Sequence, residues 1–206
     1  MPLGMVSAVV YILHVFLGQA LWPAYDPMTM DISSLTAVGA PNAALLNVLC
    51  GVYGVCFLLF ALAMLVQARR AYHRVTQIGY AVFLVMALTT VVGYRLFPLT
   101  GDKTVMNFQN MMHIVVTVVV VLTTIASFFL IAFGYLKKEG LRPLGRLTLA
   151  AAVLMTVCGA LNPIGMANGW NILGLTERLV IFTLQAAVFF LSFLYTTRSP
   201  LTNPLA

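Results

Sequence analysis

The stretch 93–113 lies between two long apolar runs and contains four side chains that can carry a charge or move a proton: Arg95, Asp102, Lys103 and His113. The apolar runs, residues 75–94 and 114–134, are each long enough to cross a bilayer, which takes about 20 apolar residues. The stretch is therefore expected at one membrane face. Charged side chains there either anchor the chain or form a site.

A polar stripe continues from His113 into the apolar run that follows it. Asn110, His113, Thr117 and Thr124 recur at spacings that place them on one face of a helix. Polar residues inside membrane spans usually face the bundle interior. The stripe therefore predicts a polar funnel running inward from this face, and His14 on the first apolar run is expected to reach the same funnel.

The leading hypothesis is the binding of a lipid headgroup or small amphiphile, with the apolar spans accommodating its tail. Arg95 and Arg178 are expected to hold an anionic group, because guanidinium pairs well with phosphate and carboxylate. Glu177 is expected to pair with one of these arginines. The residues predicted to line the pocket are Arg95, His113, Glu177, Arg178, Asn110, His14, Asn47 and Asn162.

The sequence leaves an alternative open, an intramembrane hydrolase or acyltransferase that acts on a lipid. His113 would be the base, Ser33 or Ser34 the nucleophile, and Asp31 or Asp102 the acid that orients the imidazole. These residue types are all expected at the same face, so the chemistry is allowed. Whether the protein is an enzyme is not decided by the sequence.

Composition determines the fold class. Of the 206 residues, 62% are hydrophobic and 8% are charged, whereas about 25% are charged in a soluble domain. The chain is predicted to be an all-α polytopic membrane protein, and its length allows one transmembrane domain, residues 1–206, with about six spans. The predicted spans are 4–22, 44–68, 75–96, 110–135, 147–161 and 175–197, the fifth being short and ending at Asn162 and Pro163. The segment 23–43 is expected to be an ordered loop or a half-inserted segment.

Orientation follows from the distribution of Lys and Arg, because cytoplasmic loops carry the excess. Eight of the eleven lie at one face: Arg69, Arg70, Arg74, Lys137, Lys138, Arg142, Arg146 and Arg198. Both termini are therefore predicted to be cytoplasmic, in the plasma membrane. The pocket would then open to the extracytoplasmic face, where Asp26, Asp31, Asp102 and Glu177 also lie.

No cofactor or metal is expected. Cys50, Cys56 and Cys158 lie inside apolar runs without metal-ligand spacing and are interpreted as small buried residues. The net charge of +6 does not indicate nucleic acid, because the basic residues are confined to short connections. The expected partners are membrane lipids and a small amphiphilic ligand, and a homo-oligomer is left open.

Several short motifs occur in a characteristic order. They are ISSL at 32–35 followed by Gly39, Ala40 and Pro41, FPL at 97–99, His113 at the start of a span, and GLTER at 174–178. In this order the chain resembles domain-of-unknown-function family 998, multi-pass prokaryotic membrane proteins, over nearly its whole length. The resemblance implies Ser33, His113, Glu177 and Arg178 as family positions but no activity. Family members usually have an acid directly after FPL, where this chain has Thr100 and places its acid at Asp102.

Overall fold

The computed structural model describes residues 1–101, 105 and 107–197, and this part of the chain contains helices but no named strand. Six segments are long and apolar enough to cross a bilayer: α1 Leu3–Ala20, α2 Ala43–Ala71, the span Arg74–Leu96, α5 Phe108–Leu136, α6 Arg142–Ala167 and α7 Leu173–Thr197. The span Arg74–Leu96 consists of α3 Arg74–Leu88, η2 Thr89–Gly93 and α4 Tyr94–Leu96. The prediction of an all-α, six-span membrane protein is confirmed.

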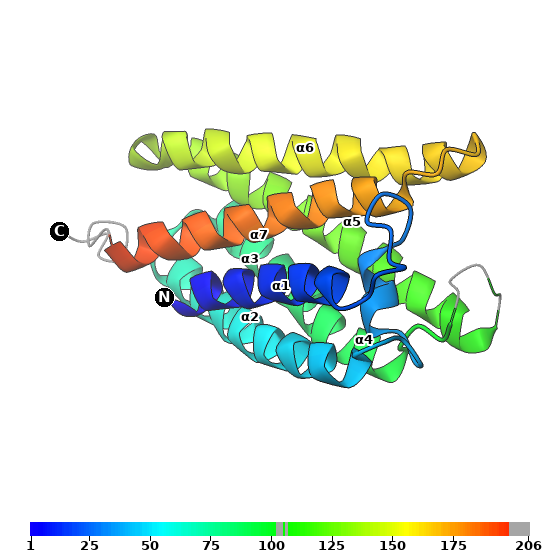
Figure 1. Ribbon diagram of the computed structural model, residues 1–206. Coiled ribbons are helices and arrows are strands. Elements are labelled where there is room, and N and C mark those ends of the chain that lie inside the picture. Colours follow the sequence, from blue (N-terminus) through cyan, green and yellow to red (C-terminus); the bar gives the residue numbers. More distant parts are fainter. Residues whose placement is uncertain (102–104, 106, 198–206) are drawn as a thin grey trace.

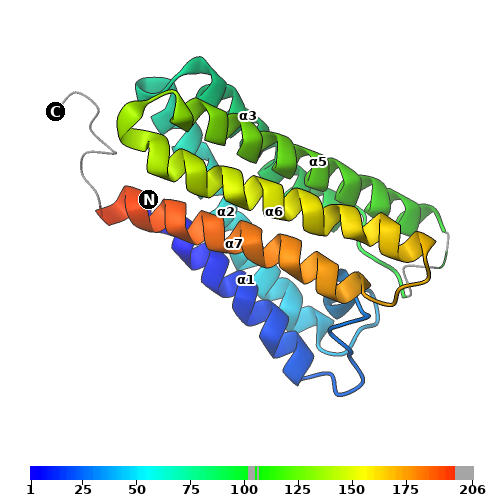
Figure 2. The same ribbon diagram turned by 90° about the horizontal axis from the view of Figure 1, so that it is seen from above.

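The six spans pack as a ring in chain order (Figures 1 and 2). Each span contacts the next along the chain, and α7 closes the ring by packing against α1. Short connections make neighbouring spans antiparallel. The start of α1 and the end of α7 therefore lie together, where the Met5 backbone N–H donates to Ser192 Oγ at 2.9 Å.

Five predicted spans agree with the structure to within three residues at each end. The fifth prediction, 147–161, was wrong, because α6 runs from Arg142 to Ala167 with Pro163 inside it. A proline removes one backbone hydrogen bond and need not end a helix. The helix instead ends just before Gly169. The φ of 68° at Gly169 allows the Trp170 N–H to donate to the Gly165 carbonyl at 2.8 Å.

The third span contains a wide turn just before its C-terminal end. η2 is a π-helical segment, Thr89–Gly93, between α3 and α4. The hydroxyls of Thr89 and Thr90 donate to carbonyls one turn earlier, Val85 and Met86, at 2.9 Å each. Such insertions change the direction of the side chains that follow, which here are Tyr94 and Arg95.

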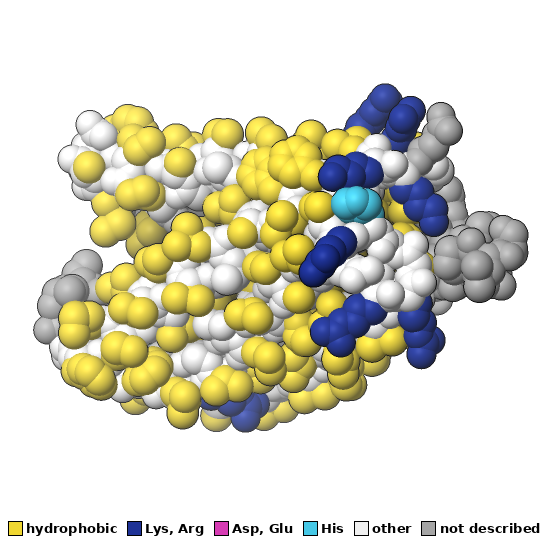
Figure 3. Space-filling view, turned by 180° about the vertical axis from the view of Figure 1, so that it is seen from behind, with side chains coloured by type: hydrophobic (Ala, Val, Ile, Leu, Met, Phe, Trp, Pro, Cys, Tyr) yellow, Lys and Arg dark blue, Asp and Glu magenta, His cyan; other side chains and the backbone are white. Residues whose placement is uncertain are grey.

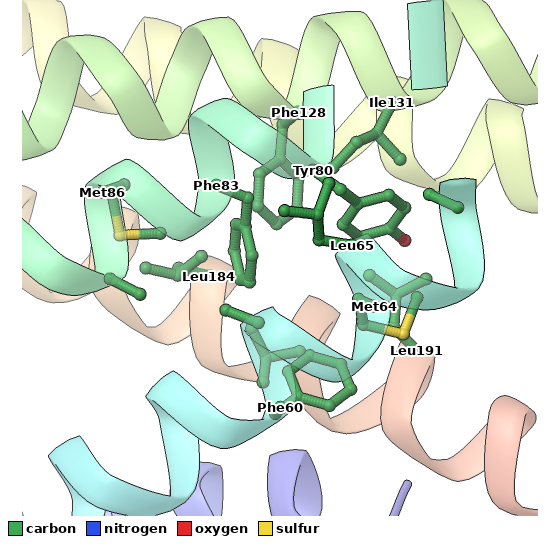
Figure 4. Packing of buried hydrophobic residues seen from close by; sticks show 14 of the residues in the cluster. Phe60, Met64, Leu65, Tyr80, Phe83, Met86, Phe128, Ile131, Leu184 and Leu191 are labelled. Atoms are coloured by element: carbon green, nitrogen blue, oxygen red, sulfur yellow. The ribbon is translucent and has the colours of Figure 1, made fainter. Parts of the chain in front are cut away.

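The middle of the ring is filled by aromatic side chains. Phe57, Phe60, Phe83 and Phe128 are all fully buried, and Phe83 contacts the other three with ring centroids 5.4–6.5 Å apart. Methionine and leucine side chains complete this core (Figure 4). We call these four residues the aromatic core. Together they separate the two ends of the bundle interior by an apolar layer.

A chain of four tyrosine hydroxyls lies on one side of the aromatic core. The Tyr80 and Tyr135 hydroxyls are 2.5 Å apart, those of Tyr135 and Tyr195 2.8 Å apart, and Tyr195 donates to Tyr72 at 2.8 Å. The chain ties α3, α5, α7 and the turn after α2 together. A buried phenol needs a partner in an apolar interior, and these residues serve as partners for one another.

Lys and Arg gather at the same end as the tyrosine chain. Arg69 and Arg70 end α2, Arg74 begins α3, and Arg142 begins α6. Figure 3 shows this grouping at one end of the face it presents. We call it the basic end and the opposite end the lid end. A cytoplasmic basic end remains a prediction.

The tyrosine chain predicts a graded loss of stability. Tyr135→Phe removes a hydroxyl that bonds to both Tyr80 and Tyr195, whereas Tyr80→Phe removes only one bond. Each such bond contributes about 0.6 kcal/mol on average within a membrane protein. We expect Tyr135→Phe to lower the thermal unfolding midpoint in detergent more than Tyr80→Phe does. Equal midpoints for the two variants would contradict a continuous chain.

Candidate functional site

The lid end is covered by an ordered segment. Residues 23–42, which we call the lid, contain the 3₁₀-helix η1, Ile32–Thr36. Ile32 and Leu35 of the lid are buried in a second small core together with Val15 of α1 and Leu46 of α2. The Val38 N–H donates to the Leu99 carbonyl at 2.8 Å, which joins the lid to the loop that follows α4. The segment 23–43, expected to be an ordered loop or a half-inserted segment, is ordered and contains one short helix.

Arg178 holds the lid to α7. Its side chain is 8% exposed, and Nη1 donates to the carbonyl oxygens of Met30 at 3.0 Å and Gly174 at 2.9 Å. Nη2 donates to the Tyr25 hydroxyl at 2.5 Å. With the Gln19 amide oxygen turned towards it, Arg178 also donates to α1 at 3.1 and 3.2 Å. All of these acceptors are uncharged oxygens of the lid, of α1 and of α7 itself.

The residues beside Arg178 bind the lid backbone as well. Glu177 Oε2 accepts from the Ile32 N–H at 2.7 Å, and the Leu175 N–H donates to the Met28 carbonyl at 3.0 Å. The first turn of α7 therefore exchanges hydrogen bonds with the lid in both directions. The GLTER motif is a clasp for the lid.

Tyr25 transmits the Arg178 contact to the rest of the lid. Its hydroxyl donates to the carbonyls of Met30 at 3.1 Å and Asp31 at 2.8 Å, and its ring lies 5.4 Å from the guanidinium carbon. Burial raises the pKa of Tyr25 to about 12, although the Arg178 cation opposes the shift. The phenol is therefore protonated at neutral pH and can donate to both carbonyls.

The candidate nucleophiles lie within the lid. Ser34 Oγ donates to Oδ1 of the buried Asp31, and the Ser33 carbonyl accepts from the Thr36 hydroxyl at 3.3 Å. The other candidate acid, Asp102, lies outside the described residues. Asp31 thus has Ser34 as a hydrogen-bond partner within η1.

Asn110 and His113 both fix the loop after α4. Asn110 is fully buried, and its Oδ1 accepts from the Thr100 N–H and hydroxyl at 2.8 Å each, while Nδ2 donates to the Thr100 and Val105 carbonyls. His113 Nδ1 lies 2.9 Å from the Phe97 carbonyl. A carbonyl only accepts, so Nδ1 carries the proton and Nε2 of the neutral ring is an acceptor.

Tyr94 links His113 to the bundle interior. Its ring centroid lies 5.0 Å from that of His113, and its hydroxyl donates to Thr117 Oγ1 at 3.2 Å. Its phenol also interacts electrostatically with Glu177 and Asp31. We call Tyr94, His113 and Thr117 the α4–α5 cluster. The stripe predicted on α5 does face inward here, as the burial of Asn110, His113 and Thr124 also indicates.

A second polar group lies between α1, α2 and α7. The Tyr11 ring packs edge-on against His14 at 5.3 Å and against Tyr53 at 4.7 Å, and Gln185 Nε2 donates to the Tyr53 hydroxyl at 3.4 Å. We call these four residues the α1–α7 cluster. Tyr11 lies within electrostatic range of both Tyr94 and Glu177, so the two clusters belong to the same half of the bundle.

The remaining predicted residues lie apart from these clusters. Arg95 is exposed beside Gly51 of α2, and Asn47 is exposed and donates to the Ala43 carbonyl at 2.9 Å. Asn162 accepts from the Thr176 hydroxyl and so ties α6 to α7. Within the described part of the chain, no three His, Cys, Asp or Glu residues are grouped to hold a metal ion.

A family model described as "Protein of unknown function (DUF998)" matches residues 5–194, which include nearly all of the six spans. The chain belongs to this family. The resemblance seen in its short motifs is thereby confirmed. No curated protein and no solved structure matches the chain.

Sequence reasoning about this DUF998 protein missed its tyrosines. Tyr25, Tyr53 and Tyr94 supply hydroxyls around the lid and both clusters, yet tyrosine in an apolar run resembles ordinary packing. Gln185 gave a stronger signal, since an amide in the middle of a span needs an interior partner.

Arg178→Lys should loosen the lid. A lysine amine cannot reproduce the planar fork that reaches Met30, Gly174 and Tyr25 together. We expect limited proteolysis within residues 23–31 to be several times faster in this variant. Arg146→Lys, at the exposed basic end, is the matched control and should be cleaved at the wild-type rate. Equal cleavage of both variants would contradict the clasp.

Gly174→Ala tests the close approach of lid and helix. A Cβ at this position would collide with the carbonyl oxygens of Met30 and Pro27, which are held backbone atoms. Gly159→Ala, where the nearest atom is 3.7 Å away, is the control. We expect hydrogen exchange at lid amides to rise only in Gly174→Ala. Unchanged exchange there would show that the lid can move aside.

Proposed function

We propose that this DUF998 protein binds a small amphiphile or lipid headgroup in the lid-end half of its interior. The observation that carries the proposal is the presence of two polar clusters in the lid-end half of the bundle interior, where they include polar atoms without a partner. Insertion into a membrane does not require such groups, and each is costly unless it has a use or a partner. The apolar faces of the spans would accommodate the tail.

The aromatic core supports binding rather than passage. Phe57, Phe60, Phe83 and Phe128 lie between the α1–α7 cluster and the tyrosine chain, with Tyr53 stacked on Phe57 at 5.2 Å. A polar group that entered from the lid end would meet this apolar layer. The site is therefore proposed to be open at one end only.

The roles of the two arginines differ in this proposal. Arg178 is occupied by the lid and acts as a positioning residue for the cover of the site. Arg95 is exposed at the lid end and can attract an anionic headgroup. The lid end is proposed to face outside the cell from the plasma membrane, with both termini cytoplasmic, as the Lys and Arg count indicates.

The alternative, a lipid hydrolase or acyltransferase, has less support. Ser34 donates to Asp31, while His113 Nδ1 is directed at the Phe97 carbonyl. The proton acceptor of His113 is therefore Nε2, whereas the one hydroxyl proton of Ser34 is donated to Asp31. Incubation with a lipid pool followed by mass spectrometry, for wild type and for Ser33→Ala and His113→Ala, separates the two functions. Product that disappears in the variants while binding persists would favour catalysis.

The binding proposal predicts a retained lipid. Native mass spectrometry of protein incubated with phosphatidylglycerol, phosphatidylethanolamine and a monoacylglycerol should reveal at least one bound probe at a stoichiometry of about one. The double variant Tyr94→Phe/Thr117→Val removes the hydroxyl pair of the α4–α5 cluster. We expect retention to fall several-fold in it.

The control for this experiment is Thr123→Val, at a half-buried position of the same helix, where the hydroxyl bonds back to the Val119 and Val120 carbonyls. It should retain the probe as wild type does. Wild-type protein that retains none of the three probes would reject the proposed function.

A further inference from the structure

Two side chains of the α1–α7 cluster carry hydrogen-bonding atoms without a partner in the structure. His14 and Gln185 are each 2% exposed. No hydrogen bond of good geometry reaches either ring nitrogen of His14 or Oε1 of Gln185, and the nearest acceptor for the imidazole is the Tyr11 carbonyl one turn earlier. Leaving such atoms unpaired in an apolar interior is costly, so their presence points to an occupant.

The register of α1 against α7 brings these atoms to the same depth. Met5 contacts Ser192 at the basic end, and Gln19 contacts Arg178 at the lid end. The two contacts are fourteen residues apart on each antiparallel helix, so His14 lies opposite Thr183. Gln185 is two residues further along, about 3 Å at 1.5 Å per residue.

The third helix of the cluster closes the arrangement. Tyr53 of α2 accepts from Gln185 at 3.4 Å, and its ring contacts Tyr11, which in turn contacts His14. The four side chains therefore form one continuous set of contacts across three helices. This arrangement makes the unpaired atoms part of one site.

We propose that the α1–α7 cluster binds the vicinal diol of an uncharged polyol headgroup. This inference rests on the proposed function, because it names the polar end of the same amphiphile. The open groups are one donor and one acceptor on the neutral His14 ring and one acceptor on Gln185. Two neighbouring hydroxyls supply the two donors and one acceptor that these groups need.

Charge argues against an anion at this position. The guanidinium of Arg178 is held by lid oxygens, and Arg95 is exposed. The charged group that acts on the cluster is the carboxylate of Glu177, which interacts electrostatically with Tyr11. An uncharged hydroxyl group avoids both repulsion by this carboxylate and the cost of burying an ion.

The test compares three probes of equal chain length by native mass spectrometry of the full chain. They are a monoacylglycerol, which ends in a vicinal diol, the corresponding fatty alcohol and the fatty acid methyl ester. We expect wild type to retain the monoacylglycerol at least tenfold more than the methyl ester, with the alcohol between them. His14→Phe and Gln185→Leu, which keep bulk but remove the polar atoms, should each lower this retention at least fivefold.

Thr183→Val is the matched control, because it lies at the same depth and its hydroxyl is already bonded to the Leu179 carbonyl at 2.6 Å. It should bind as wild type does. Thermal midpoints measured without probe add a second readout. Because the proposed site is empty without probe, removing its unpaired polar atoms should raise the midpoint of both variants.

The remaining outcomes separate the diol site from amphiphile binding. Equal retention of all three probes, or retention unchanged in both variants, overturns the diol site and leaves amphiphile binding in place. Wild type that retains no amphiphile at all rejects both. If wild type does not retain the monoacylglycerol and both variants have lower thermal midpoints, the polar atoms bind a water molecule and no diol. This outcome also overturns the proposal. If one variant fails to fold, the other variant and the comparison of the three probes on wild type still test the diol site.

Discussion

A polar group inside a bilayer-spanning bundle has no water to bond to, so it must find its partner within the protein or in a ligand. This constraint accounts for most of the polar contacts described above. At the basic end, four tyrosine hydroxyls bond to one another. At the lid end, Arg178 and Asn110 satisfy loop carbonyls that would otherwise be left without donors. Among the buried polar atoms without a partner in the described part of the chain, those of His14 and Gln185 suggest a bound molecule.

The same constraint explains why the motifs at the lid end are mostly concerned with architecture. A 20-residue loop over an apolar bundle has many backbone groups to satisfy. Glu177 accepts from one lid amide and Arg178 donates to a lid carbonyl and to Tyr25, while Gly174 leaves room for the backbone to approach. The clasp therefore determines what covers the interior, and this in turn controls which molecules can enter it.

The interior changes character along its length. Polar clusters occupy the lid-end half, the aromatic core follows, and the tyrosine chain lies towards the basic end. A protein that only needed to fill its ring could have used leucine throughout. The stability of the fold therefore does not explain why the half beneath the lid is polar.

Much of the fold could be predicted from the sequence, because a bilayer imposes span length and an excess of apolar residues. Five spans were located closely for this reason. The fifth span along the chain, α6, was predicted too short, because Pro163 suggested an end that in fact comes at Gly169. The α5 stripe, with Asn110 and His113 facing inward, followed from helical periodicity. His14, which was expected to reach the bundle interior, is buried as well.

What only the tertiary structure decided is which polar groups meet. From the sequence, Arg178 was expected to bind an anionic ligand. In the structure the lid passes beside it, and its guanidinium donates to lid oxygens instead. The tyrosines resembled packing residues, because a sequence does not reveal whether a phenol in an apolar run has a partner on another helix. Helix periodicity fixes the face of each residue, whereas the register between helices, on which the meeting of His14 and Gln185 depends, is set by packing across the whole ring.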